Sequence, residues 1–232
     1  MSAMPEINRF VQDALHTLLN SVCDGFEDGE LAYLSSQGKN ELQIRDKIAW
    51  RLHKTIKDKY GDQYVVCREW SPKGFGRAKV DLAILVLSPN CDSVISAVAL
   101  IEFKAQSIVR KEHWYINEFE HDIKKMKEIV EKSPICKNAN MYFVFLETGQ
   151  EKKVDKFKPI IAYSKYQTYK VKYYSNLDYK SAIKSYREEF NRKLVKPIMI
   201  NEPKVIDIGA SYGYKQYISP LIIGPLKPTD IK

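Results

Sequence analysis

Three short apolar runs in the middle of the chain constrain its fold more than any other feature. They span residues 64–67, 80–87 and 94–103, and each is rich in the β-branched residues that are typical of strands. The segments between them, 71–77 and 88–90, contain the Gly, Pro, Ser and Asn residues of loops and turns. This pattern predicts three consecutive strands in the core of one sheet.

Helices are predicted before and after these strands. Apolar residues recur at helical spacing over 5–22, 38–59 and about 116–130, and a further buried strand is predicted over 141–146. The acidic, glycine-containing segment 24–30 is interpreted as a connector. The element order is therefore α, α, β, β, β, α, β, which predicts an α/β sandwich with a mixed β-sheet flanked by helices.

The last part of the chain, residues 150–232, is basic and rich in Tyr, and its structure is harder to predict. Residues 178–193 have a helical pattern, and 205–208 have the pattern of a strand. Between residues 151 and 200, Lys and Arg outnumber Asp and Glu by 13 to 5, an excess equal to the net charge of +8 of the whole chain. Such a positive field attracts a polyanion, most commonly nucleic acid, and a lysine-rich solvated face explains it equally well.

Composition sets limits on the class of protein. A chain of 232 residues with 44% hydrophobic content can bury one core, so a single domain over residues 1–232 is expected. The four cysteines form no C-x-x-C pair and the four histidines no zinc-binding spacing, which is typical of a reduced protein without zinc. No apolar run approaches the roughly 18 residues of a membrane span, and the first residues do not resemble a signal peptide. A cytoplasmic protein with no membrane partner is expected.

Charged side chains interrupt the predicted core strands at a few positions. Glu102 and Lys104 share one face of the strand that ends in Ile101-Glu102-Phe103-Lys104, because side chains alternate along a strand. Asp81 is a lone carboxylate within the run 80–87. Burying such groups is costly unless they are paired or bind a metal. If the two strands are adjacent and antiparallel, Asp81 lies beside Glu102, and two close carboxylates need a cation.

A fourth charged residue lies on the predicted helix 38–59. At about 100° per residue, Glu41 falls on the apolar face of this helix, together with Ile48 and Leu52. Arg45 lies on the same face, so a salt bridge between Glu41 and Arg45 is the structural explanation for this carboxylate. The alternative is that Glu41 belongs to the same site as Asp81.

This ordered set resembles the PD-(D/E)XK nuclease superfamily, whose restriction-endonuclease-like fold occurs in type II restriction endonucleases and in several resolvases and repair nucleases. The resemblance rests on Glu41 on a helix, Asp81 on a strand and Glu102-x-Lys104 on the next strand, followed by a helix. It covers a catalytic core of about residues 38–148. The sequence has Val80 in place of the proline that gives the motif its name.

The resemblance implies an endonuclease that uses Mg²⁺, or Mn²⁺ as a substitute, to hydrolyse phosphodiester bonds of DNA. Asp81, Glu102 and the backbone carbonyl of Phe103 would be the metal ligands, which suits the preference of Mg²⁺ for oxygen. Lys104 would orient or deprotonate the attacking water and steady the scissile phosphate. Glu41 would bind a second ion or a water.

Partners follow from the same resemblance. DNA is the expected partner, with RNA as the other polyanion that fits, and Lys73, Arg77 and Lys79 would contact phosphates unless they form a solvated loop. A double-strand cut needs two active sites, which favours a homodimer. A restriction or phage-defence role is expected. The alternatives are a catalytically silent nucleic-acid-binding module of the same fold and a structural protein whose acidic residues only form ion pairs.

Other residues have a structural interpretation that we favour over a functional one. Asp122, His113 and His121 are expected to face solvent, and Trp50 and Trp70 to pack in the core. A group of tyrosines among lysines suits base stacking, although packing on the core is the preferred interpretation. These are Tyr163, Tyr166, Tyr169, Tyr173 and Tyr174.

Overall fold

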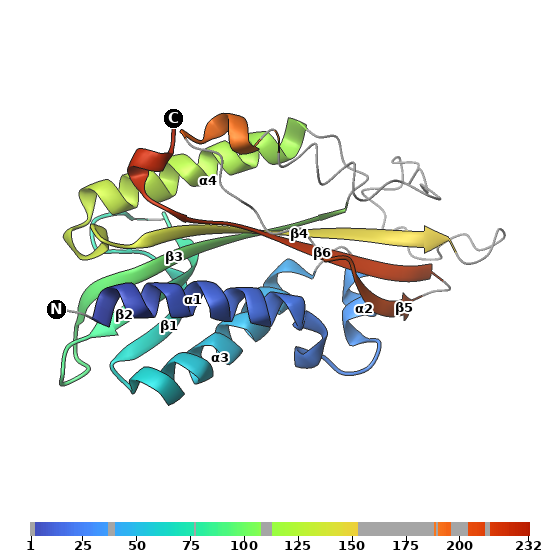
Figure 1. The fold of residues 1–232 in the computed structure, drawn as a ribbon, viewed down its shortest axis with the longest axis horizontal. Helices are drawn as coiled ribbons and strands as arrows, with labels where there is room; N and C mark the ends of the chain where they lie inside the picture. The colour runs from blue at the N-terminus through green and yellow to red at the C-terminus, as the bar shows by residue number, and fades with distance from the viewer. Residues whose placement is uncertain are drawn as a thin grey trace.

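The computed structural model of the protein has a mixed β-sheet between layers of helices (Figure 1). It describes residues 3–36, 40–76, 78–107, 113–152, 188, 190–195, 204–211 and 214–232. The tyrosines of 160–175 lie outside these ranges, and of the predicted helix 178–193 only residues 188 and 190–193 are described, all helical. None of the helices within the described ranges is long and apolar enough to cross a membrane.

Six strands form the sheet in the order β1-β2-β3-β4-β6-β5. They are β1 (Tyr64–Trp70), β2 (Val80–Leu87), β3 (Val94–Ser107), β4 (Asn140–Lys152), β5 (Ile206–Ser211) and β6 (Tyr214–Leu226). β3 and β4 are parallel and all other neighbours are antiparallel, so the sheet is mixed, as predicted. The four central predictions, at 64–67, 80–87, 94–103 and 141–146, are confirmed as β1 to β4.

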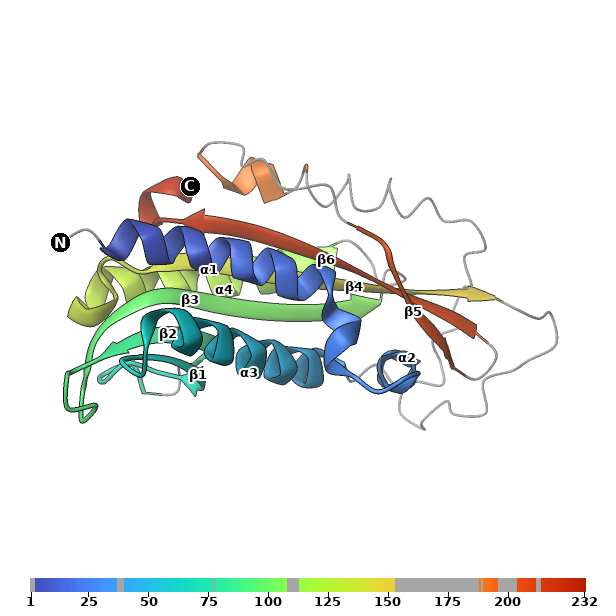
Figure 2. The same ribbon diagram turned by 60° about the horizontal axis from the view of Figure 1, so that its bottom comes forward.

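Helices lie on both faces of the sheet (Figure 2). They are α1 (Ala3–Asn20), α2 (Glu30–Ser36), α3 (Glu41–Tyr60) and α4 (His113–Lys132), with short 3₁₀ turns at Val22–Gly25, Pro134–Cys136 and Pro228–Asp230. α1 and α3 cover one face, whereas α4 crosses the other face and joins the parallel strands β3 and β4. The predicted long helices are confirmed. The short helix α2 was not predicted, because seven residues are too few to show a clear period.

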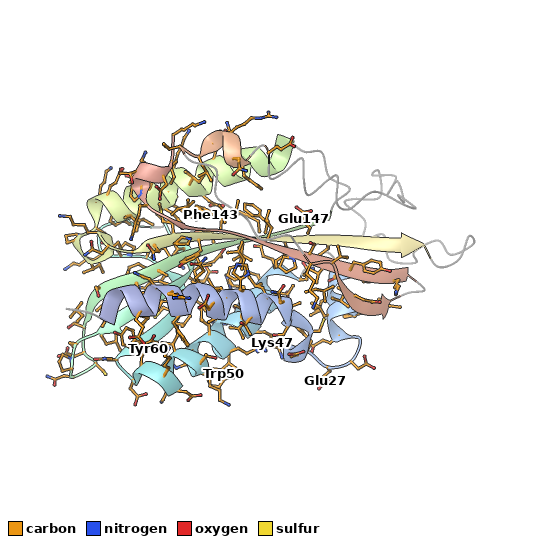
Figure 3. The ribbon with its side chains drawn as sticks, viewed as in Figure 1. Glu27, Lys47, Trp50, Tyr60, Phe143 and Glu147 are labelled. Atoms are coloured by element: carbon orange, nitrogen blue, oxygen red, sulfur yellow. The ribbon has the colours of Figure 1, made fainter. Side chains whose placement is uncertain are left out.

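An apolar core lies on each face of the sheet, and β3 contributes to both. Ile101 and Phe103 belong to the core under α1 and α3. Leu100 belongs to the core under α4, where Figure 3 also shows Phe143. Because side chains alternate along a strand, Glu102 faces the same side as Leu100. Glu102 and Lys104 therefore face α4.

The strand β6 was missed in the sequence. It contains Pro220, Gly224 and Pro225, which are residues that normally argue against a strand. β5 pairs only with the first part of β6, from Tyr214 to Ile218. Both prolines lie beyond this part: Pro220 pairs with Leu146 of β4, and Pro225 lies where the pairing of β4 with β6 becomes irregular, which is a position where proline is tolerated in a sheet. Tertiary context therefore makes this segment a strand.

Candidate functional site

The charged residues gather where β3 continues beyond its pairing with β2. The antiparallel pairing of β2 with β3 ends with Leu82 opposite Ile101, and Asp81 and Glu102 are the next residue on each strand. The two carboxyl groups are close enough for the charge of Asp81 to raise the pKa of Glu102. On its other edge β3 stays paired with β4 as far as Ser107. Beyond Ile101, the β2 side of β3 is thus available to side chains.

Two carboxylates occupy this edge of β3. Asp81 Oδ2 accepts a hydrogen bond of 2.7 Å from the Phe103 N–H, and Glu41 Oε2 accepts one of 2.6 Å from the Ala105 N–H. In a strand, the N–H and C=O of one residue point to the same edge, and residues two apart share that edge. The carbonyl of Phe103 therefore faces this edge too, between the two N–H groups that hold the carboxylates.

Arg45 on α3 forms ion pairs with carboxylates of two further elements. Its side chain is only 6% exposed, and it forms ion pairs with Asp81 Oδ1 at 3.2 Å, with Asp46 Oδ1 at 3.0 Å and with Glu69. Glu69 lies in β1 with a φ of +50°, where the regular pairing of β1 with β2 is interrupted. Among the described residues these three are the ion-pair partners of Arg45. The expected salt bridge to Glu41 is therefore replaced by the bond between Glu41 and the strand.

On the opposite side, α4 supplies two residues to the site. Lys125 Nζ lies 2.6 Å from Glu102 Oε1 and 3.0 Å from Asp122 Oδ1. The other oxygen of Asp122, Oδ2, lies 3.0 Å from Lys104 Nζ. The side chains of Glu102 and Asp122 are 4% and 6% exposed, so this is a buried cluster of two acids and two amines. Glu102 and Lys104 face the same side, as the alternation of β3 predicts.

The prediction that Asp122 faces solvent is wrong. Asp122 is buried and pairs with both lysines of the site. A signal was present in the sequence, since Asp122 stands three residues after Phe119 and four before Met126, within the apolar face of the helix. Lys125 was not singled out, although its contacts place it in the site. His121 is exposed, as expected.

Burial and like charge determine the protonation of the site. Burial, followed by the negative charge of Asp81, raises the pKa of Glu102 from its ordinary value of 4.5 to about 8. Burial also raises the pKa of Glu41. For Lys104, burial alone would lower the pKa, but the neighbouring carboxylates of Asp122, Glu102 and Glu41 outweigh it and raise the pKa. Lys104 therefore keeps its proton at neutral pH, so it can donate a hydrogen bond but cannot accept a proton.

The donor atoms at this site are of the kind that Mg²⁺ or Mn²⁺ prefers, namely carboxylate and carbonyl oxygens. Within the described part of the chain, however, no three His, Cys, Asp or Glu side chains stand together as a group that could hold a metal ion. Arg45 and Lys125 instead engage Asp81 and Glu102. The oxygen donors are thus of a suitable kind for such a cation, but in this structure basic side chains contact the carboxyl groups of Asp81 and Glu102.

The other residues singled out in the sequence have varied positions. Lys73 and Lys79 are exposed in the loop between β1 and β2, which agrees with either of their interpretations, and Arg77 lies outside the described residues. The prediction that Trp50 packs in the core is wrong, because Trp50 is 67% exposed on the side of α3 that faces away from the sheet (Figure 3). Trp70 is partly buried against the core under α4.

Comparison of the chain with protein-family models, with curated proteins and with solved structures finds no match. The class of protein therefore has to be inferred from the fold and the site alone. The chain has a six-stranded mixed sheet between helices, and a cluster of carboxyl groups and basic side chains around the part of β3 that extends beyond its pairing with β2.

Proposed function

We propose that this chain is a metal-dependent endonuclease of the PD-(D/E)XK type that hydrolyses phosphodiester bonds of DNA. The observation that carries the proposal is that Asp81 and Glu41 bind the same edge of β3, while Asp81 is near enough to Glu102 to raise its pKa and Lys104 shares a face of β3 with Glu102. The order α3, β1, β2, β3, α4, β4 also agrees with the order of elements on which the resemblance rests.

Each residue then has a role that its contacts support. Asp81, Glu102 and the Phe103 carbonyl would hold the cation, which supplies charge neutralisation and an activated water when it is bound. Glu41 would hold a second ion or a water at the far end of the same edge. Lys104, which keeps its proton, would donate to the scissile phosphate and orient the water rather than deprotonate it.

The residues around the site hold these groups in place. Arg45 fixes one oxygen of Asp81 while the Phe103 N–H fixes the other. Asp122 fixes the ammonium group of Lys104 through its ion pair. Such supporting contacts keep reacting groups in a defined geometry, which is a large part of what an active site contributes.

A second candidate function is favoured by one observation. Asp81 and Glu102 each have a basic partner, Arg45 and Lys125, so the cluster is also what a structural ion-pair network or a silent nucleic-acid-binding module would contain. Under this reading the carboxylates stabilise the fold and need no cation.

One experiment separates the candidates. Supercoiled plasmid is incubated with the purified protein and Mg²⁺, beside a reaction with EDTA. An endonuclease cuts in Mg²⁺ and not in EDTA, and its Asp81→Asn and Glu102→Gln variants are folded and inactive. The matched control is Glu128→Gln, which changes an exposed carboxylate of α4 and should cut as the wild type does. Binding of DNA without cleavage would identify the silent module, and neither activity would identify the structural network.

A further inference from the structure

We propose that the ammonium group of Lys125 occupies, in the metal-free site, the oxygen of Glu102 that a divalent cation takes when it binds, and that Lys125 is then held by Asp122 alone. Binding of the metal ion would then replace the ammonium group of Lys125 at Glu102. This inference rests on the proposed function, because it takes Glu102 as a ligand of the cation.

The geometry of Lys125 carries the inference. Its ammonium group touches two carboxylates at once, Glu102 at 2.6 Å and Asp122 at 3.0 Å. The contact to Glu102 is made at Oε1, so it occupies an oxygen that a cation would need. Lys125 comes from α4 and Glu102 from β3, so the pairing depends on the packing of this helix on the sheet. A cation and this ammonium group therefore compete for the same carboxylate.

Asp122 makes the exchange possible. A buried ammonium group that loses its only partner is strongly destabilising. Lys125 avoids this cost, since it keeps Asp122 Oδ1 when Glu102 is given up to a cation. Asp122 Oδ2 continues to hold Lys104, so one carboxylate balances both lysines after the exchange. The side chain of Asp122 is 6% exposed, which means that solvent does not substitute for it.

Substitution of Lys125 and substitution of Asp122 should change the affinity for divalent cations in opposite directions. Lys125→Met keeps an unbranched side chain of similar length and removes the competing charge, so Mn²⁺ and Mg²⁺ should bind roughly tenfold tighter or more, which is about 1.4 kcal/mol per tenfold. Asp122→Asn removes the negative charge that balances the displaced ammonium group, so both ions should bind more weakly by a similar factor. A purely structural role for this cluster predicts changes in melting temperature without opposite changes in affinity.

The test is calorimetric titration of MnCl₂ and of MgCl₂ into the metal-free full chain, with no nucleic acid present. The matched control is Lys132→Met, which removes an exposed lysine of the same helix, paired with Glu128 at 2.6 Å, and should bind as the wild type does. If Lys125→Met does not fold, Lys125→Gln takes its place, since it keeps a polar end without the charge.

The outcomes distinguish this inference from the proposed function. Tighter binding by Lys125→Met together with weaker binding by Asp122→Asn supports the exchange. Equal binding by wild type and Lys125→Met, or unchanged binding by Asp122→Asn, overturns the exchange and leaves the proposed nuclease standing. No binding of either ion to wild type and variants overturns the metal site, and the exchange falls with it.

Discussion

The buried carboxyl group of Glu102 should make the stability of the metal-free protein depend on pH in a defined direction. Its pKa is raised from 4.5 to about 8 in the folded chain, mainly by burial and then by the charge of Asp81. Between these two values the folded state keeps a proton on Glu102 that the unfolded state has lost. The stabilisation is therefore complete below the unfolded pKa and is lost as the pH rises through the folded pKa.

The size of the effect follows from the two pKa values. The free energy of unfolding falls by about 1.4 kcal/mol for each pH unit over which the two states differ by one proton. From the unfolded pKa to the folded pKa this slope amounts to about 5 kcal/mol as an upper limit. Rearrangement of Lys125 around the ionised carboxylate reduces the loss, so a few kcal/mol is expected in practice.

Glu102→Gln isolates this contribution, because glutamine has almost the same shape and cannot ionise. At about pH 5 the variant should be nearly as stable as the wild type, whose Glu102 is protonated when folded. At about pH 9 the variant should be more stable by a few kcal/mol. The measurement is urea unfolding of both proteins across this range, in the presence of EDTA.

The control is Glu128→Gln, which alters an exposed carboxylate on α4 and should show no such trend. A stability difference between Glu102→Gln and wild type that stays constant from acid to alkaline pH would refute the reasoning. It would mean that Lys125 keeps Glu102 ionised throughout, and that burial does not control this carboxyl group.

Three further predictions test other parts of the site. Asp81→Asn should destabilise the metal-free protein by roughly 1–3 kcal/mol in urea unfolding, because Asp81 pairs with buried Arg45. A gain in stability, from relief of the repulsion between Asp81 and Glu102, would contradict this. Lys104→Ala should abolish cleavage yet still bind Mn²⁺ in calorimetry, whereas loss of binding would make Lys104 part of the metal site. The last prediction concerns Lys152, Lys153 and Lys156, of which the last two lie outside the described residues. Neutralising all three should make the slope of log affinity for duplex DNA against log salt concentration shallower by up to roughly three units. An unchanged slope would assign these lysines to a solvated face.

Local patterns in the sequence were enough to predict the central strands and the long helices. Periodicity reports which side chains of an element are buried, and that is a property of consecutive residues. For the same reason the shared face of Glu102 and Lys104 could be predicted from their spacing alone. The antiparallel adjacency of Asp81 and Glu102 was also accessible, because the strands that carry them are joined by a short turn.

The remaining features depend on how distant elements pack together. Arg45 binds Asp81, and Glu41 binds the Ala105 N–H, only because α3 packs on one face of the sheet. Asp122 and Lys125 reach Glu102 only because α4 crosses the other face of β3. A charged residue on an amphipathic helix has the same local pattern whether it faces water or a buried partner. The sequence by itself determined which strand carries the acid and the amine, and the tertiary structure decided which charges surround them, because those partners come from elements that meet only when the helices pack on the sheet.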